Sequence, residues 1–103
     1  MSYRVEVSDD ASNEIVNIYQ YLAFVVLAGE AAKKQVLRIE KAILSLSEMP
    51  ERARAYDRGV WKDRNLRVLP VDNFSVFFLV DKEQQKVIVL HVYYGKRDLD
   101  HLV

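Results

Sequence analysis

The eight residues from Phe74 to Asp81, FSVFFLVD, are the feature that most limits how this chain can fold. In an extended strand its alternate side chains form two faces: Phe74, Val76, Phe78 and Val80 on one, and Ser75, Phe77 and Leu79 on the other. Because both faces are largely apolar, the pattern predicts a central strand that is covered on both sides or nearly so.

Two helices are predicted ahead of this strand. Apolar residues recur at helical spacing from about 9 to 27, after the capping run Ser8-Asp9-Asp10, and Gly29 is a suitable stop. A second apolar stripe predicts a helix from about 30 to 48, which Pro50 ends. Since few residues join the two helices, we expect an antiparallel helical hairpin with a shared apolar seam.

Short polar connections predict an antiparallel meander of three strands after the hairpin, and residues 50 to 64 read as a long loop. The predicted strands are Tyr3 to Val7, Asn65 to Leu69, Phe74 to Asp81 and Val87 to Tyr94. In the last strand, strict alternation groups Ile88, Leu90, Val92 and Tyr94 on one face and Val87, Val89, His91 and Tyr93 on the other. The expected fold is α+β, with the hairpin on one face of a mainly antiparallel four-stranded sheet. The second face, with Phe77, Leu79, Val87 and Val89, would then lack a cover, which is typical of a partner-binding surface.

Length and composition narrow the function. A chain of 103 residues is one domain, 1–103, and it has no cysteine for a disulfide, a thiolate metal site or a nucleophile. The N-terminus alternates polar and apolar residues instead of forming a signal peptide, so we expect a cytoplasmic protein that does not enter a membrane. No phosphate-binding glycine loop or histidine metal motif occurs, and neither cofactor nor metal is expected.

Charge is concentrated in one segment. The net charge is zero, yet residues 51 to 67 hold six basic and three acidic side chains. This segment could meet a phosphate backbone or an acidic partner, or it could be a solvated loop whose arginines cap nearby elements. Its candidate RNA- or target-binding residues are Arg52, Arg54, Arg58, Lys62 and Arg64.

A second cluster could support RNA cleavage without a metal. Such cleavage needs a group that activates the ribose 2′-hydroxyl, cations that hold the phosphate, and a donor for the leaving oxygen. His91 and Tyr93 could handle protons, and Arg67, Lys96 and Arg97 could supply the cations. His91 could equally be an ordinary strand histidine, hydrogen-bonded at a sheet end.

The whole chain resembles the toxins of the RelE/ParE superfamily, which are paired with antitoxins in bacterial type II toxin-antitoxin systems. The resemblance rests on the first strand, the hairpin ending in Ser45–Pro50, Leu66–Leu69, Phe74–Asp81 and the closing block His91-Val92-Tyr93-Tyr94-Gly95-Lys96-Arg97-Asp98. It implies a RelE/ParE-like fold and an antitoxin whose C-terminal segment wraps the groove and helices. The expected antitoxin contacts are Tyr21, Phe24, Phe77 and Leu79. The expected assembly is a heterotetramer with the antitoxin or a homodimer of the toxin.

The resemblance leaves the target open, because some members cleave mRNA on the ribosome and others inhibit DNA gyrase. The leading hypothesis is a ribosome-dependent, metal-independent mRNA endoribonuclease that uses Arg67, His91, Tyr93, Lys96 and Arg97. The alternatives are a non-enzymatic gyrase inhibitor of the ParE type and an inactive toxin-like binding module. Ser75 supports the alternatives, because ribonuclease members commonly carry an arginine there and a serine cannot hold a phosphate with a permanent charge.

Overall fold

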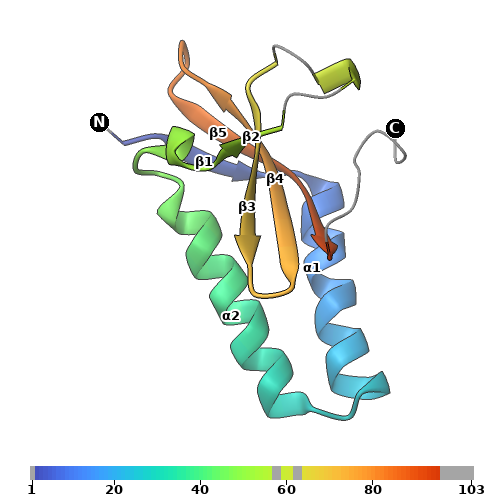
Figure 1. Cartoon of the computed structure of the whole chain (residues 1–103). Coiled ribbons are helices and arrows are strands. Elements are labelled where there is room, and N and C mark those ends of the chain that lie inside the picture. Colours follow the sequence, from blue (N-terminus) through green and yellow to red (C-terminus); the bar gives the residue numbers. More distant parts are fainter. Residues whose placement is uncertain (1, 57–58, 62–63, 96–103) are drawn as a thin grey trace.

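Two helices pack against a single sheet in the computed structural model of this chain, which describes residues 2–56, 59–61 and 64–95 (Figure 1). The helices are α1 (Asp9–Gln20) and α2 (Gly29–Ser45), with short helical turns at η1 (Tyr21–Val25), η2 (Pro50–Arg52) and η3 (Gly59–Trp61). The strands are β1 (Arg4–Val7), β2 (Arg54–Ala55), β3 (Leu66–Val71), β4 (Phe74–Asp81) and β5 (Lys86–Tyr94). The α+β arrangement predicted from the sequence is confirmed.

The sheet has five strands in the order β1-β5-β4-β3-β2. β1 runs parallel to β5, whereas all the other neighbours are antiparallel. The sequence predicted four strands, and the fifth, β2, comes from the segment that was expected to be a loop. β2 contributes only two residues, whose lack of a clear alternating pattern explains why it was missed.

The helical hairpin is shaped by its ends. The Ser8 side chain accepts a hydrogen bond from the Ala11 amide at 3.0 Å, which caps α1, and Asp9 and Asp10 place negative charge in its first turn. α1 then widens into the π-helical turn η1, and Leu27, at φ 60°, reverses the chain. Gly29, expected to stop the first helix, instead begins α2. None of the helices in the described ranges is long and apolar enough to cross a bilayer.

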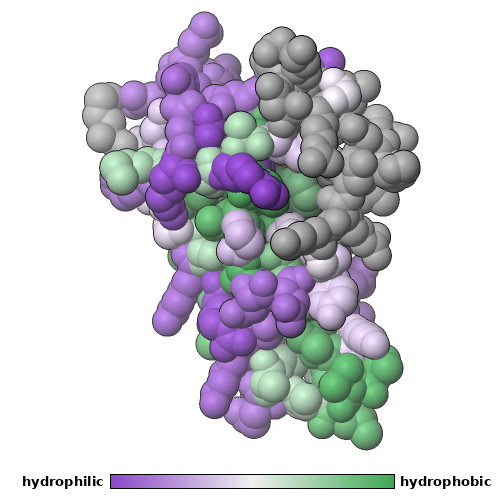
Figure 2. All heavy atoms as spheres, viewed as in Figure 1, coloured by the Kyte–Doolittle hydropathy of each residue, from purple (hydrophilic) through white to green (hydrophobic). Residues whose placement is uncertain are grey.

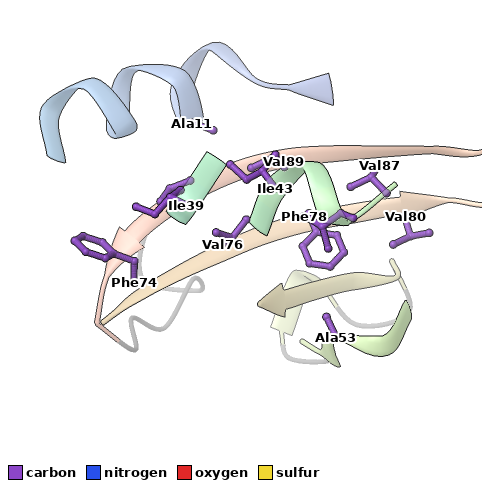
Figure 3. Close-up of a cluster of buried hydrophobic side chains, with 12 residues drawn as sticks. Ala11, Ile39, Ile43, Ala53, Phe74, Val76, Phe78, Val80, Val87 and Val89 are labelled. Atoms are coloured by element: carbon purple, nitrogen blue, oxygen red, sulfur yellow. The ribbon is translucent and has the colours of Figure 1, made fainter. Parts of the chain in front are cut away.

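The main core lies between the helices and one face of the sheet (Figure 3). Ile39 of α2 and Phe78 of β4 are fully buried there, and Val76, Val87 and Val89 line the same face. The predicted inward face of β4 is therefore confirmed. Burial of each such side chain stabilises the fold by about 1.5–3 kcal/mol.

The predicted faces of β5 are wrong before His91, because Val87 and Val89 were expected beside Phe77 on the uncovered face but lie in the helix-covered core. Phe77 pairs with His91 and Phe78 with Val89, so Leu90 is an extra residue that forms a β-bulge. The bulge shifts the alternation by one residue, and Val87, Val89 and Val92 all lie in the helix-covered core. Leu90 and Tyr93 lie in a second cluster with Phe77, on the other side of the sheet.

This second face is also better covered than the sequence predicted. Tyr56 and Trp61, from the supposed loop, pack over Phe77, which retains only 2% of its exposed surface. The ring of Tyr56 meets that of Phe77 edge to face, with centroids 5.6 Å apart. The short element between β2 and β3 therefore supplies the missing cover for this part of the sheet.

Candidate functional site

The helix α1 and the outer edge of β5 meet at Glu14 and His91. One carboxylate oxygen of Glu14 lies 3.1 Å from His91 Nδ1, and the other accepts the Val92 backbone N–H at 2.9 Å. β1 pairs with β5 only as far as Val89, which leaves the next part of this edge open to the helix. Glu14 therefore takes the place of a neighbouring strand and fixes the imidazole at the same time.

This contact determines what His91 can do chemically. An ionised carboxylate only accepts hydrogen bonds, so Nδ1 carries a hydrogen in this contact, and in the neutral form of the ring the other nitrogen, Nε2, carries the lone pair. The two side chains are each about one quarter exposed, at 24% for His91 and 23% for Glu14. The imidazole is thus oriented and reachable from solvent, as a proton acceptor must be. Glu14 was not among the predicted site residues, because 77 positions separate it from His91 and no local motif joins them.

Tyr93 continues the site across the sheet. Its ring stacks on the His91 imidazole with centroids 4.9 Å apart and an interplanar angle of 15°. The Tyr93 ring is also tilted by 57° against the ring of Phe77, with centroids 6.0 Å apart. The structure therefore brings together two of the predicted proton-handling residues, His91 and Tyr93.

Arg67 lies apart from this pair. It sits opposite Phe78 in the β3–β4 ladder, on the helix-covered face, whereas its neighbours Leu66 and Val68 belong to the second cluster with Tyr93. Its guanidinium donates to the backbone carbonyls of Glu51 at 3.0 Å and Ala53 at 2.7 Å. Its Nε donates to Asn65 Oδ1 at 3.2 Å. With a side chain only 17% exposed, Arg67 ties the segment after α2 to the sheet.

Glu51 and Asp72 have shifted acidities. Burial raises the pKa of Glu51, but hydrogen bonds from Lys82 and Asn65 and the charges of Lys82 and Arg67 outweigh it, so the pKa lies below its usual value. The hydrogen bond from Arg38, followed by that from Gln35, lowers the pKa of Asp72. Both shifts arise from contacts that join secondary-structure elements, away from His91. Within the described residues, no three histidine or acidic side chains are grouped to hold a metal ion.

Ser75, where an arginine was expected in a ribonuclease member, is buried at 6% exposure. Its hydroxyl donates to the Gly95 carbonyl at 2.8 Å, which holds the end of β5 against β4. The position is therefore occupied by a structural hydrogen bond.

The predicted basic residues are dispersed. Arg52 donates to the carbonyls of Ser45, Glu48 and Met49, which caps the C-terminal end of α2. Arg54 is exposed on the edge strand β2, and Arg64 lies over the Trp61 ring at 6.0 Å. The remaining predicted cations, Arg58, Lys62, Lys96 and Arg97, lie outside the described residues.

The four predicted antitoxin contacts lie in two separate parts of the molecule, the end of the helical hairpin and the second cluster on the sheet. Tyr21 and Phe24 are exposed at 53% and 71%, at the far end of the helical hairpin. Phe77 is buried beneath Tyr56, contrary to the expected open face, and Leu79 is half-buried beside it. Because Phe77 is only 2% exposed, it offers almost no surface to a partner.

An apolar groove of about 560 Å³ runs between α1 and α2 instead. Val16, Leu37 and Leu44 line it and remain more than half exposed, with Ile15 and Ile43 at its floor. This groove was not predicted, because the same helical spacing describes a stripe that packs on the sheet and a stripe that faces outward. The groove is a concave, mainly apolar surface of the kind that accepts an amphipathic segment.

Comparisons with known proteins agree with this architecture. In the solved chromosomal ParDE TA system from P. aeruginosa, one chain matches with a TM-score of 0.74 and 18% identity, covering 92% of this chain and 98% of that one. A chain of the RelBE2 toxin-antitoxin complex from Mycobacterium tuberculosis matches with a TM-score of 0.63 and 17% identity, over 91% and 99% of the two chains. A chain of the archaeal RelE-RelB complex from Pyrococcus horikoshii matches with a TM-score of 0.64 and 13% identity, over 95% and 100%.

At these identities the solved structures establish the shared fold. Comparison with curated protein sequences found no match. The family described as the ParE toxin of the type II toxin-antitoxin system parDE matches residues 5–99, which is nearly the whole chain. The chain therefore belongs to the ParE toxin family of type II toxin-antitoxin systems.

Proposed function

We propose that this protein is a toxin that an antitoxin holds inactive, and that it arrests growth by binding DNA gyrase without cleaving RNA. The observation that carries the proposal is the position of Arg67. It lies on the helix-covered face, whereas His91 and Tyr93 stack on the other side of the sheet. The described members of the expected catalytic set therefore do not converge on one phosphate.

RNA cleavage requires that convergence. A cation must neutralise the phosphate within hydrogen-bond distance of the groups that move protons. The Arg67 guanidinium already donates to Glu51, Ala53 and Asn65, so a phosphate would have to displace bonds that hold the fold together. Ser75 contributes no charge in place of the arginine of ribonuclease members.

The antitoxin is proposed to bind the groove between α1 and α2. Val16, Leu37 and Leu44 are exposed there at 52%, 55% and 67%, and Glu40 and Lys41 lie at its margin. An amphipathic helix could bury these side chains while its polar edge meets Glu40 and Lys41. The ParDE and RelBE chains with the same fold come from toxin-antitoxin systems, which supports a protein partner of this kind.

The test combines expression without antitoxin with assays of the purified chain. We expect DNA synthesis to fall before translation, mRNA to stay intact, and the purified chain to inhibit supercoiling by gyrase. The discriminating variant is His91→Gln, whose amide can still donate to Glu14 but provides no imidazole base. Under the gyrase proposal, His91→Gln arrests growth as the natural chain does.

A ribosome-dependent endoribonuclease remains the second candidate, because Glu14 orients His91 as a base would require. Prompt loss of translation, new cuts within ribosome-bound mRNA, and loss of toxicity in His91→Gln would establish it and refute the gyrase proposal. Undisturbed growth on expression of the folded chain would instead indicate an inactive binding module.

A further inference from the structure

The far end of the helical hairpin is an exposed apolar surface. It consists of five residues, which we name the hairpin tip: Tyr21, Phe24, Val25, Val26 and Leu27, exposed at 53%, 71%, 69%, 51% and 82%. Figure 1 shows this end of the hairpin extending beyond the sheet, and Figure 2 shows strongly hydrophobic side chains gathered there. The tip is thus, like the groove between α1 and α2, a part of the helices that the protein's own core leaves uncovered.

The backbone is unusual at the same place. Residues 21–25 form a π-helical turn, a rare conformation that occurs often at functional sites. Leu27 follows at φ 60°, in the left-handed region that a leucine seldom adopts. Leu27 is the most exposed large apolar residue among those described, and its side chain lies on the outside of the turn. Strain of this kind persists where the surrounding structure or a function maintains it.

A hollow of about 540 Å³ lies directly beside the tip. Tyr21 and Val26 belong both to the tip and to the hollow, and Phe74 and Tyr94 form its opposite wall. Tyr94 is 64% exposed and stands edge-on to Phe74, with centroids 5.5 Å apart. Projecting apolar side chains and a hollow that could receive them are therefore adjacent on one surface.

We propose that a second copy of this chain covers the tip, in a two-fold dimer in which Phe24 and Leu27 of each copy enter the hollow of the other. A two-fold interface places the same patch against itself, so a charged patch would repel its copy. Residues 15–29 contain no charged side chain, which removes that repulsion. The proposal does not depend on the toxin's target.

The area is sufficient for a weak dimer. A whole aromatic side chain buries about 150–250 Å², and an aliphatic one somewhat less. With the exposed fractions given above, the tip and Tyr94 offer on the order of 600–800 Å² per copy, against about 800 Å² per partner in a standard interface. The dimer should therefore form in a concentration-dependent manner.

Sedimentation velocity of the purified full chain, over a wide concentration range, tests the association. Leu27→Asn removes the apolar side chain and suits the left-handed backbone, so it should fold normally by circular dichroism. We expect the dimer dissociation constant to rise by about 100-fold or more, because two buried leucines are lost per dimer and each is worth more than tenfold. Met49→Asn is the matched control, since Met49 is also exposed, at 71%, with φ 45°, but lies at the other end of α2.

Cysteine cross-linking tests the position of the contact. The natural chain has no cysteine, so Phe24→Cys, Val25→Cys or Leu27→Cys each creates a unique thiol, with Met49→Cys as control. At least one tip variant should form a disulfide-linked dimer under mild oxidation, more readily than the control.

The following outcomes would overturn the proposal. A chain that is monomeric at every concentration would leave the tip to the antitoxin, the occupant expected for Tyr21 and Phe24 from the sequence. A dimer that Leu27→Asn does not weaken would place the interface elsewhere. Open-ended assemblies would exclude a closed two-fold pair.

Discussion

Replacement of Arg67 by alanine should destabilise the fold by about 3 kcal/mol, although the sequence nominates this residue as catalytic. The guanidinium makes four hydrogen bonds, to the Glu51 and Ala53 carbonyls, to Asn65 Oδ1 and, at 3.4 Å, to the Glu51 carboxylate. Hydrogen bonds to a charged group contribute roughly 1.5–3 kcal/mol each. Water can enter the vacated site, since the side chain is 17% exposed, and the freed segment can relax, so we expect about 3 kcal/mol instead of the full sum.

Urea denaturation followed by circular dichroism measures this loss, and the melting temperature should fall by about 12 °C for a chain of this length. Arg67→Lys should give an intermediate loss, because a single ammonium cannot reproduce the planar fork of donors. Arg54→Ala, at an exposed position on β2, is the control and should stay within about 0.5 kcal/mol of the natural chain. If the free energy of unfolding of Arg67→Ala also stays within about 0.5 kcal/mol of that of the natural chain, Arg67 does not tie the segment after α2 to the sheet.

Three further predictions concern polar contacts between elements. Glu14→Ala should lower the free energy of unfolding by about 2 kcal/mol and speed hydrogen exchange at the Val92 amide. Glu14→Gln keeps an acceptor for this amide and should lose less stability. Equal exchange rates in the two variants would contradict the role of Glu14 at this edge. Asp72 has a lowered pKa in the folded chain, so it should stabilise the fold at pH values above its unfolded pKa of 3.8, and this stability should be lost as the pH falls through the lower folded pKa. In Arg38→Ala, an NMR titration should show the pKa of Asp72 moving up toward 3.8. An unchanged pKa would disprove that the hydrogen bond from Arg38 lowers it. Ser75→Ala should cost about 1 kcal/mol in urea denaturation, through loss of the bond to the Gly95 carbonyl, and no loss would show that this bond contributes nothing.

Local patterns in the sequence predicted the elements that are repetitive. The helical stripe that includes Ile39 and Ile43, and the alternation along Phe74–Asp81, both face the core as expected. These predictions succeed because the periods of helices and strands are properties of the backbone itself. The cap at Ser8 also follows from local chemistry, since its side chain reaches an amide three positions away.

A single irregular residue defeated the same reasoning in β5. Strict alternation put Val87 and Val89 on the same face as Tyr93, but the bulge at Leu90 moves the alternation by one position, so Val87 and Val89 face the helices while Tyr93 joins the second cluster. A one-residue shift exchanges the two faces of every later residue, and strict alternation carries no signal for it. Which side of the sheet Val87 and Val89 face was therefore decided by the pairing with β4.

The sequence by itself determined the α+β class, the helical hairpin, the central strand and the resemblance to the toxin family that the ParE match confirms. Only the tertiary structure decided which polar groups meet. It placed Glu14 beside His91, 77 positions away in the chain, and turned Arg67 toward the carbonyls of Glu51 and Ala53. Residue type and spacing describe what a side chain can donate or accept, but packing of distant elements determines which partner it finds.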